Sequence, residues 1–250
     1  TDALAENTQV QWGEKASYAW TAVMNSAQLR EEAFGLLQDF LPRADVPTLA
    51  VCNTLNWPRS GLVRVFIDHE MLPPDRAFRI LDGAQPVPVQ AMERRSEGTY
   101  WALWVRDVPP LGFKILRIET SDQPRAKDTP GAESLTLEND FYKLALDADK
   151  GAIKSLVDKE TGRELVDPSA AWGLGQCIYE TMPGRRDFKP DSFKRTSVRN
   201  VTVKPGASGP IWKSLLLTAD LDGCATNGVR AEIRVYDVEK RIELRFAVRK

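Results

Sequence analysis

Near its end the chain reads Val229-Arg230-Ala231-Glu232-Ile233-Arg234-Val235-Tyr236 and, after a turn at Glu239-Lys240, Ile242-Glu243-Leu244-Arg245-Phe246-Ala247-Val248. Apolar and polar residues alternate with a period of two in both halves, which predicts a two-stranded β-ribbon with one apolar face. A ribbon of two strands is marginal by itself and needs further strands or a covering layer. We therefore predict a mainly β protein. We also expect further structure beyond Lys250, because the last strand would otherwise be a bare edge.

Short runs with the same period fill the chain after Pro42, and turn residues separate them, as in a β-sandwich. The run Tyr-Trp-Ala-Leu-Trp-Val at residues 100–105 is apolar on both faces, so we expect this strand to lie between two layers. The predicted strands are residues 48–52, 61–67, 78–81, 87–92, 99–105 and 113–118.

A long helix is predicted at residues 12–41, which contain no proline, and Pro42 ends it. The apolar residues Val23, Ala27, Phe34, Leu37 and Leu41 recur at steps of three, four and seven, which is typical of an amphipathic helix. An apolar stripe of this length must pack on something. Since no other segment predicts a long helix, we expect its partner to lie outside this chain.

Residues 121–133 have the composition of a linker, with two prolines and a glycine among polar residues. A second β region follows, with predicted strands at residues 141–147, 152–158 and 163–166. The predicted organisation is a helical segment at residues 1–42, a small β-sandwich at 43–120, the linker at 121–133 and a second β domain at 134–250.

Composition limits the function. Of 250 residues, 42% are hydrophobic and 28% are charged, and the formal net charge is −1. That balance fits a globular protein with a real core and gives no overall field for nucleic acid or an anionic membrane. The three cysteines, Cys52, Cys177 and Cys224, suggest neither a disulfide framework nor a metal site. We interpret them as small buried hydrophobes, which fits a reducing compartment such as the cytoplasm.

Few residues indicate chemistry. His69 is the only histidine, so a histidine-based metal site or a Ser-His-Asp triad would depend on it. Its position just after a predicted strand favours a solvated loop. The 35 Asp and Glu residues permit a glycosidase-type carboxylate pair, but no motif selects one. The basic stretch at residues 181–199 is interpreted as a solvated loop or a loop that reaches a neighbouring domain.

Tryptophans offer one candidate for sugar contact. Trp20, Trp57, Trp101, Trp104 and Trp212 stand in periodic or apolar contexts and are predicted to be core. Trp172 lies in Trp172-Gly173-Leu174-Gly175, which we interpret as a tight bend. An aromatic ring there could stack on the apolar face of a sugar or could simply pack locally.

Four segments resemble glycoside hydrolase family 38, the zinc-dependent α-mannosidases. Residues 51–61 resemble the FNTLSWPR segment that opens the family's β region, and residues 137–144 resemble its LENxxYRL strand. Residues 151–165 are similar to its GGIxSLxDKxxGRELV hairpin, and residues 174–180 are similar to the LGQFxYE of bacterial members. The four segments keep the family's order.

The resemblance implies a fragment of a retaining α-mannosidase: the end of the helical middle domain, a small β-sandwich and part of a galactose-mutarotase-like supersandwich. Zinc, its His and Asp ligands and the Asp nucleophile would lie in the parent's catalytic domain, since no segment here resembles those motifs. We therefore expect no catalytic residue, no metal ligand and no cofactor in this chain, and no activity of the fragment alone.

Within this resemblance, Gln176, Tyr179 and Glu180, together with Trp172, are the candidates for reaching a substrate, although they could equally hold the bend by local hydrogen bonds. The expected partners are the parent's catalytic domain and a mannose-containing carbohydrate, with self-association also open. Three alternatives remain: a mutarotase-like sugar epimerase, a carbohydrate-binding module and a purely structural sandwich.

Overall fold

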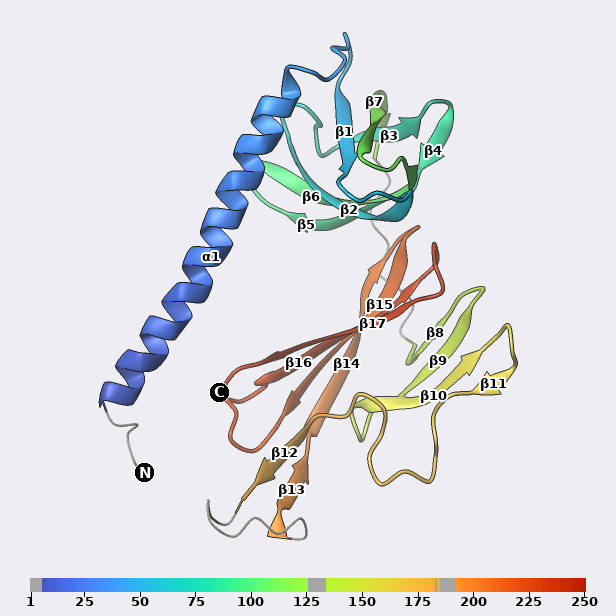
Figure 1. Cartoon of the computed structure of the whole chain (residues 1–250). Helices are drawn as coiled ribbons and strands as arrows, with labels where there is room; N and C mark the ends of the chain where they lie inside the picture. Colours follow the sequence, from blue (N-terminus) through green and yellow to red (C-terminus); the bar gives the residue numbers. More distant parts are fainter. Residues whose placement is uncertain (1–5, 126–133, 183, 185–191) are drawn as a thin grey trace. The chain divides into compact units, whose positions relative to one another are not determined.

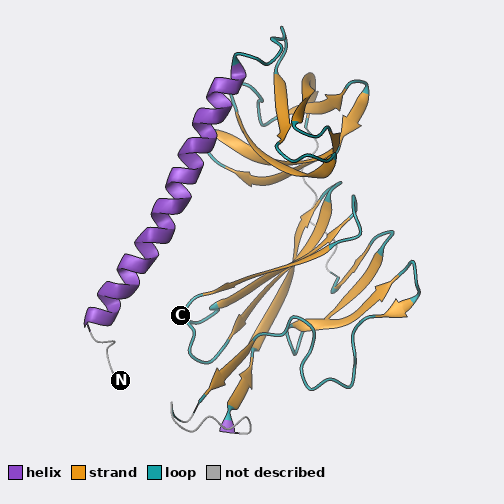
Figure 2. Ribbon diagram, in the orientation of Figure 1, coloured by secondary structure: helices purple, strands orange, loops and turns teal. Residues whose placement is uncertain are grey.

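The computed structural model of the protein describes residues 6–125, 134–182, 184 and 192–250 (Figure 1). The chain forms two compact units, residues 1–46 and residues 47–250. After one N-terminal helix, the regular structure is made of antiparallel sheets (Figure 2). The mainly β fold class with a leading long helix is therefore confirmed.

Helix α1 runs from Glu6 to Gln38, so the predicted helix is confirmed with shifted ends. None of its side chains is buried. The prediction of a single apolar stripe is wrong: at 3.6 residues per turn, Tyr18, Leu29 and Leu36 lie off that stripe, and they are 72%, 66% and 73% exposed. No helix among the described residues is long and apolar enough to cross a membrane.

Two sheets pack face to face between residues 47 and 125 and form the first sheet pair. Every strand that the sequence predicts in this region is present. One sheet has the order β1-β7-β3-β4 and the other β2-β6-β5. Side chains from both sheets share one core, which includes Ile80, Leu103 and Leu116. The strands are β1 (Thr48–Asn53), β2 (Arg59–Asp68), β3 (Arg76–Asp82), β4 (Gln85–Val87), β5 (Val89–Arg94), β6 (Gly98–Val108) and β7 (Gly112–Pro124).

Strand β6 is buried on both faces, as its sequence predicts. Trp101, Leu103 and Val105 enter the core between the two sheets. The alternate residues Ala102 and Trp104 point the other way and pack in a separate cluster.

A second pair of sheets follows. The order β11-β10-β9-β8 faces the order β14-β15-β16-β17 across a core that includes Leu144, Leu215 and Ile233, and β12 and β13 form a separate ribbon. The predicted C-terminal ribbon is β16–β17, in which Ile233 pairs with Leu244. The strands are β8 (Thr136–Glu138), β9 (Tyr142–Asp147), β10 (Ala152–Asp158), β11 (Arg163–Glu164), β12 (Ile178–Thr181), β13 (Lys194–Ser197), β14 (Arg199–Ser208), β15 (Trp212–Asp220), β16 (Val229–Tyr236) and β17 (Ile242–Val248).

The two sheet pairs meet where β6 and β5 face the start of β15. Ala102 and Trp104 pack with Ile211, Trp212 and Tyr236.

Beside this cluster, the buried Gln90 amide binds the backbone at the start of β15. Its Oε1 accepts hydrogen bonds from Ile211 N and Trp212 N at 3.0 Å each, and its Nε2 donates to Trp212 O at 3.1 Å. The Gln90 side chain, from the first sheet pair, thus makes hydrogen bonds to the backbone of β15 like those that a neighbouring strand would make.

Two sequence predictions are corrected by the fold. Part of the predicted linker, up to Pro124, continues β7 and pairs with β3, while residues 126–133 lie outside the described residues. Trp20 and Trp57 are not core: they are 67% and 55% exposed, whereas Trp101, Trp104 and Trp212 are buried as predicted. An apolar sequence neighbourhood indicates burial only if the fold covers that face, and here it covers three of the five.

Replacing Gln90 by leucine should lower the free energy of unfolding by about 1–3 kcal/mol, because the N–H groups of Ile211 and Trp212 lose their acceptor in a buried place. Urea denaturation measures this. Gln85→Leu on the exposed strand β4 is the matched control and should change stability by less than about 0.5 kcal/mol. Equal losses in the two variants would contradict the role given to Gln90.

Candidate functional site

The bend that carries Trp172 is held tightly against β10. A Cβ atom at Gly173 would lie 2.5 Å from the Cβ of Ala152, and Gly175 has a φ of +73°. Only glycine fits at position 173 without a shift of its neighbours. Position 175 has a backbone conformation that glycine adopts freely. Ile153 N also donates to Leu174 O at 2.9 Å. The predicted tight bend is therefore present.

Gln176 closes this bend. Its Oε1 accepts a hydrogen bond from Gly173 N at 2.8 Å, and its own N donates to Gly173 O at 3.1 Å. The glutamine of the predicted motif thus fixes the backbone on which Trp172 sits.

Tyr179 and Glu180 are neighbours on β12 and therefore point to opposite faces of the ribbon. Tyr179 packs against the core of the second sheet pair, and its ring lies where a Cβ on Gly223 would be, at 2.6 Å. Glu180 Oε2 accepts a hydrogen bond from Arg195 Nε at 2.5 Å across the ribbon. Both side chains have local partners.

Trp172 is 37% exposed and lines a hollow of about 210 Å³. Two carboxylates and two ammonium groups share this hollow with the indole: Asp147, Asp167, Lys150 and Lys154. An aromatic wall with hydrogen-bonding charged groups around it suits a sugar, which offers an apolar face and hydroxyl groups. The sequence prediction found Trp172 but missed the other four.

The carboxylates of this hollow are bound from one side by backbone groups. Asp147 Oδ1 accepts from Asp149 N and Lys150 N, both at 3.0 Å. The Ser169 hydroxyl, then the Ser169 N–H, lowers the pKa of Asp167 below its ordinary value. Asp167 therefore stays ionised at neutral pH and can accept hydrogen bonds from a ligand, but it is not poised as a general acid.

The hairpin motif at residues 151–165 also uses its polar side chains to hold the backbone. Asp158 Oδ1 accepts from Glu160 N at 2.9 Å, and its Oδ2 accepts from Lys240 Nζ at 2.8 Å. The hydrogen bond from Lys240 is the main reason that the pKa of Asp158 is lowered. Lys240 belongs to the turn between β16 and β17, so this pair ties the two sheets together.

Glu164 binds three donors on the same hairpin. Its carboxylate accepts from Ser155 Oγ at 2.5 Å, Leu156 N at 2.8 Å and Val166 N at 2.9 Å. The Ser155 hydroxyl, followed by the two backbone N–H groups, lowers its pKa.

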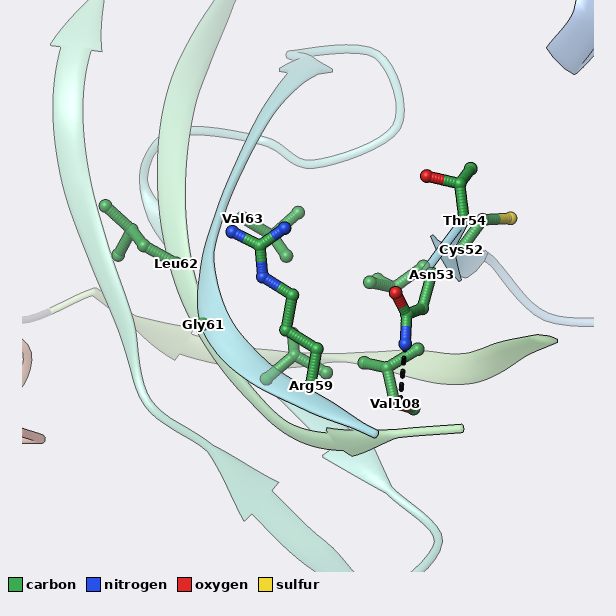
Figure 3. A pocket seen from close by; sticks show the side chains of 10 residues that line it. Cys52, Asn53, Thr54, Arg59, Gly61, Leu62, Val63 and Val108 are labelled. Carbon is green, nitrogen blue, oxygen red and sulfur yellow. Dashed lines mark hydrogen bonds between the residues drawn. The ribbon is translucent and has the colours of Figure 1, made fainter. Parts of the chain in front are cut away.

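A second hollow of about 280 Å³ opens at one end of the first sheet pair (Figure 3). Val63 and Val105 form apolar wall, and the Arg59 side chain lies over it beside Asn53. Asn53 is occupied: its Nδ2 donates to Trp57 O and Val108 O at 2.8 and 3.1 Å. The asparagine of the predicted 51–61 motif therefore closes the end of the sandwich.

The described residues contain no group of three or more His, Cys, Asp or Glu side chains that could hold a metal ion. His69 makes hydrogen-bond contacts with Ser96 O at 3.2 Å and Thr99 Oγ1 at 3.1 Å. These side chains do not fit the zinc that the resemblance to family 38 implies. The three cysteines are unpaired and partly buried, and residues 183 and 185–191 of the basic stretch at 181–199 lie outside the described residues.

Residues 137–250 match the C-terminal domain of the glycosyl hydrolases family 38. An α-mannosidase crystal structure from Enterococcus faecalis V583 covers 80% of this chain with a TM-score of 0.50 and 11% identity. A second Enterococcus faecalis structure, of a protein in glycosyl hydrolase family 38, also covers 80% with a TM-score of 0.51 and 11% identity. At that identity the likeness is one of fold.

The chain spans 29% and 30% of those two solved chains, so it corresponds to less than a third of either. Comparison with curated proteins gave no match.

Replacing Glu164 by glutamine should destabilise the protein at pH 7 and have little effect at low pH. The folded-state pKa of Glu164 is lowered, so its contribution is present above the unfolded value of about 4.3 and is lost as the pH falls through the folded value. Urea midpoints of the two proteins should therefore differ at pH 7 and converge below about pH 4. The control variant Glu70→Gln, on an exposed turn, should have the same urea midpoint as the wild type both at pH 7 and at low pH. A gap that is constant with pH would contradict the assignment.

Proposed function

We propose that this chain, whose residues 137–250 match the C-terminal domain of the glycosyl hydrolases family 38, is a non-catalytic β part of a retaining, zinc-dependent α-mannosidase. Its role is to support the substrate pocket of the parent enzyme. The fold likeness to a bacterial α-mannosidase over 80% of the chain supports the proposal. The zinc and the reacting carboxylates belong to the parent's catalytic domain.

One observation carries the proposal: the polar residues of the family-like motifs are engaged in holding the backbone. Retaining glycosidases need a carboxylate nucleophile and a second carboxyl group with a raised pKa as general acid. In contrast, hydrogen bonds from neighbouring side chains are the main cause of a lowered pKa at three carboxyl groups of these motifs, Glu138, Asp158 and Glu164.

The substrate-facing part of the proposal concerns the bend and the ribbon that follows it. Trp172 is exposed and lines the hollow together with Asp147 and Asp167. Gln176 fixes the bend behind it, while Tyr179 and Glu180 anchor the adjoining strand. We propose that Trp172 stacks on a mannose unit and that the other three candidates position it.

A carbohydrate-binding module is less well supported. Such a module would present free aromatic rings in a row on one sheet face. Tyr100 and Phe66 do lie together, with ring centroids 4.9 Å apart. However, the guanidinium groups of Arg64 and Arg95 cover the Tyr100 ring at 4.0 and 5.0 Å, which leaves little ring face for a sugar.

The chain alone should not hydrolyse p-nitrophenyl α-mannoside, either with added zinc or with a chelator. Release of p-nitrophenol measures this directly, and circular dichroism on the same sample shows that the chain is folded. Zinc-dependent turnover by the folded chain would sink the proposal, because the reacting groups would then have to lie within these 250 residues.

In the full-length parent enzyme, Trp172→Ala should raise KM for an α-mannoside several-fold, because an aromatic contact of about 1 kcal/mol or more is lost. Steady-state kinetics measure this. The matched control is Trp57→Ala, because Trp57 is also exposed but is distant from Trp172 in the sequence. If both variants keep the wild-type KM, Trp172 does not contact substrate.

A further inference from the structure

The outer face of the sheet β14–β17 has an unusual composition. Alternation along β15 sends Leu215 and Leu217 into the core, so the residue between them, Leu216, points outward. Leu216 is 43% exposed although its strand lies inside the sheet, between β14 and β16. A groove of about 730 Å³ runs over this face, a volume within the range of ligand-binding clefts.

The strand register places the groove residues in two rows across the sheet, because residues paired on neighbouring strands share a face. Lys204 pairs with Leu216, which pairs with Glu232, which pairs with Arg245. The next row consists of Thr202, Thr218, Arg230 and Ala247. All eight residues line the groove.

The charge of this face is positive. Glu232 in the groove is bound by Arg234 at 2.7 Å, and Glu243, which the register places on the same face, is bound to Arg245 at 3.2 Å. Lys204 and Arg230 are exposed and make no ion pair within the described part of the chain. Two free cations therefore flank the exposed Leu216.

Arg234, a further cation of this face, is already paired with Glu232 and Glu243. It lies on the same face as Glu232, two residues along β16, and its side chain is only 8% exposed. Its Nη1 lies 3.8 Å from Glu243 Oε2, and its guanidinium lies 4.6 Å from the centre of the Trp212 ring. Arg234 is therefore held by its own neighbours, and the cations of this face that are open to a ligand are Lys204 and Arg230.

We propose that this groove binds an extended, carboxylate-bearing segment of a protein. Strands lie about 4.8 Å apart, so the backbones at Lys204 and Arg230, two strands and one row apart, are separated by about 12 Å. In an extended chain, residues four apart on one face are separated by about 13 Å. Acidic residues at that spacing would reach both cations, with a small residue between them over Leu216 and the two threonine hydroxyls. This inference does not depend on the mannosidase proposal.

The test uses the whole chain and a fluorescein-labelled peptide Glu-Thr-Ser-Thr-Glu-Thr-Ser-Thr-Glu, with its Gln-for-Glu counterpart as the uncharged probe. Fluorescence anisotropy should show saturable binding of the acidic peptide only. The double variant Lys204→Glu with Arg230→Glu should weaken binding at least ten-fold. The matched variant Arg94→Glu with Arg106→Glu, which changes the same charge on exposed residues elsewhere, should bind as the wild type does.

Three results would overturn the proposal. The first is no saturable binding of the acidic peptide at millimolar protein, and the second is an equal loss of affinity in the groove variant and the matched variant. The proposal would also be overturned if inorganic phosphate, at a concentration equal to that of the peptide's carboxylates, displaced the labelled peptide as well as unlabelled peptide does. The face would then bind any anion. Lys204→Gln with Arg230→Gln, a milder change, keeps the test valid if charge reversal perturbs folding.

Discussion

Every backbone N–H and C=O group that is buried where a strand ends must find a partner, and in this protein side-chain amides supply many of those partners. Gln90 satisfies three backbone groups at the start of β15. Asn139 accepts from Phe141 N and Tyr142 N and donates to Tyr236 O at 2.6 Å. Because one amide group both donates and accepts, it can join two sheets that no ladder connects.

This constraint explains why the motifs that resemble family 38 look as they do. Asn53, Asn139, Asp158, Glu164 and Gln176 each come from one of the four motif segments, and each binds backbone groups at a turn, a bend or a strand end. A motif of this kind identifies a fold. It does not by itself identify a catalytic centre, which is why the family match and the proposed absence of chemistry in this chain are compatible.

Local periodicity predicted most of the strands, but it did not predict β8 or the four strands β12 to β15. The alternation at residues 229–248 gave both β16 and β17, and the doubly apolar run at residues 100–105 correctly placed β6 between two layers. The helix was also predicted, but the single apolar stripe assigned to it was wrong, since Tyr18 and Leu36 lie off the face that carries Phe34.

What the sequence could not show depends on distant contacts. Gln90 binds residues 121 and 122 positions away, and an isolated glutamine in a strand has no local sign of such a role. The hollow at Trp172 takes Asp147 from the end of β9 and Asp167 from the loop after β11, so only the fold brings them together. Trp57 stands in an apolar motif yet is exposed, because burial is decided by what covers a residue.

The central claim is that motif side chains bind backbone groups, and amide hydrogen exchange measured by NMR tests it most directly. The N–H groups of Ile211, Trp212, Phe141 and Tyr142 have side-chain acceptors. The account predicts that they exchange as slowly as ladder amides in the centre of β15, because opening them requires separating the sheets. Exchange at the rate of an exposed loop would contradict it, since those amides would then be bound to water.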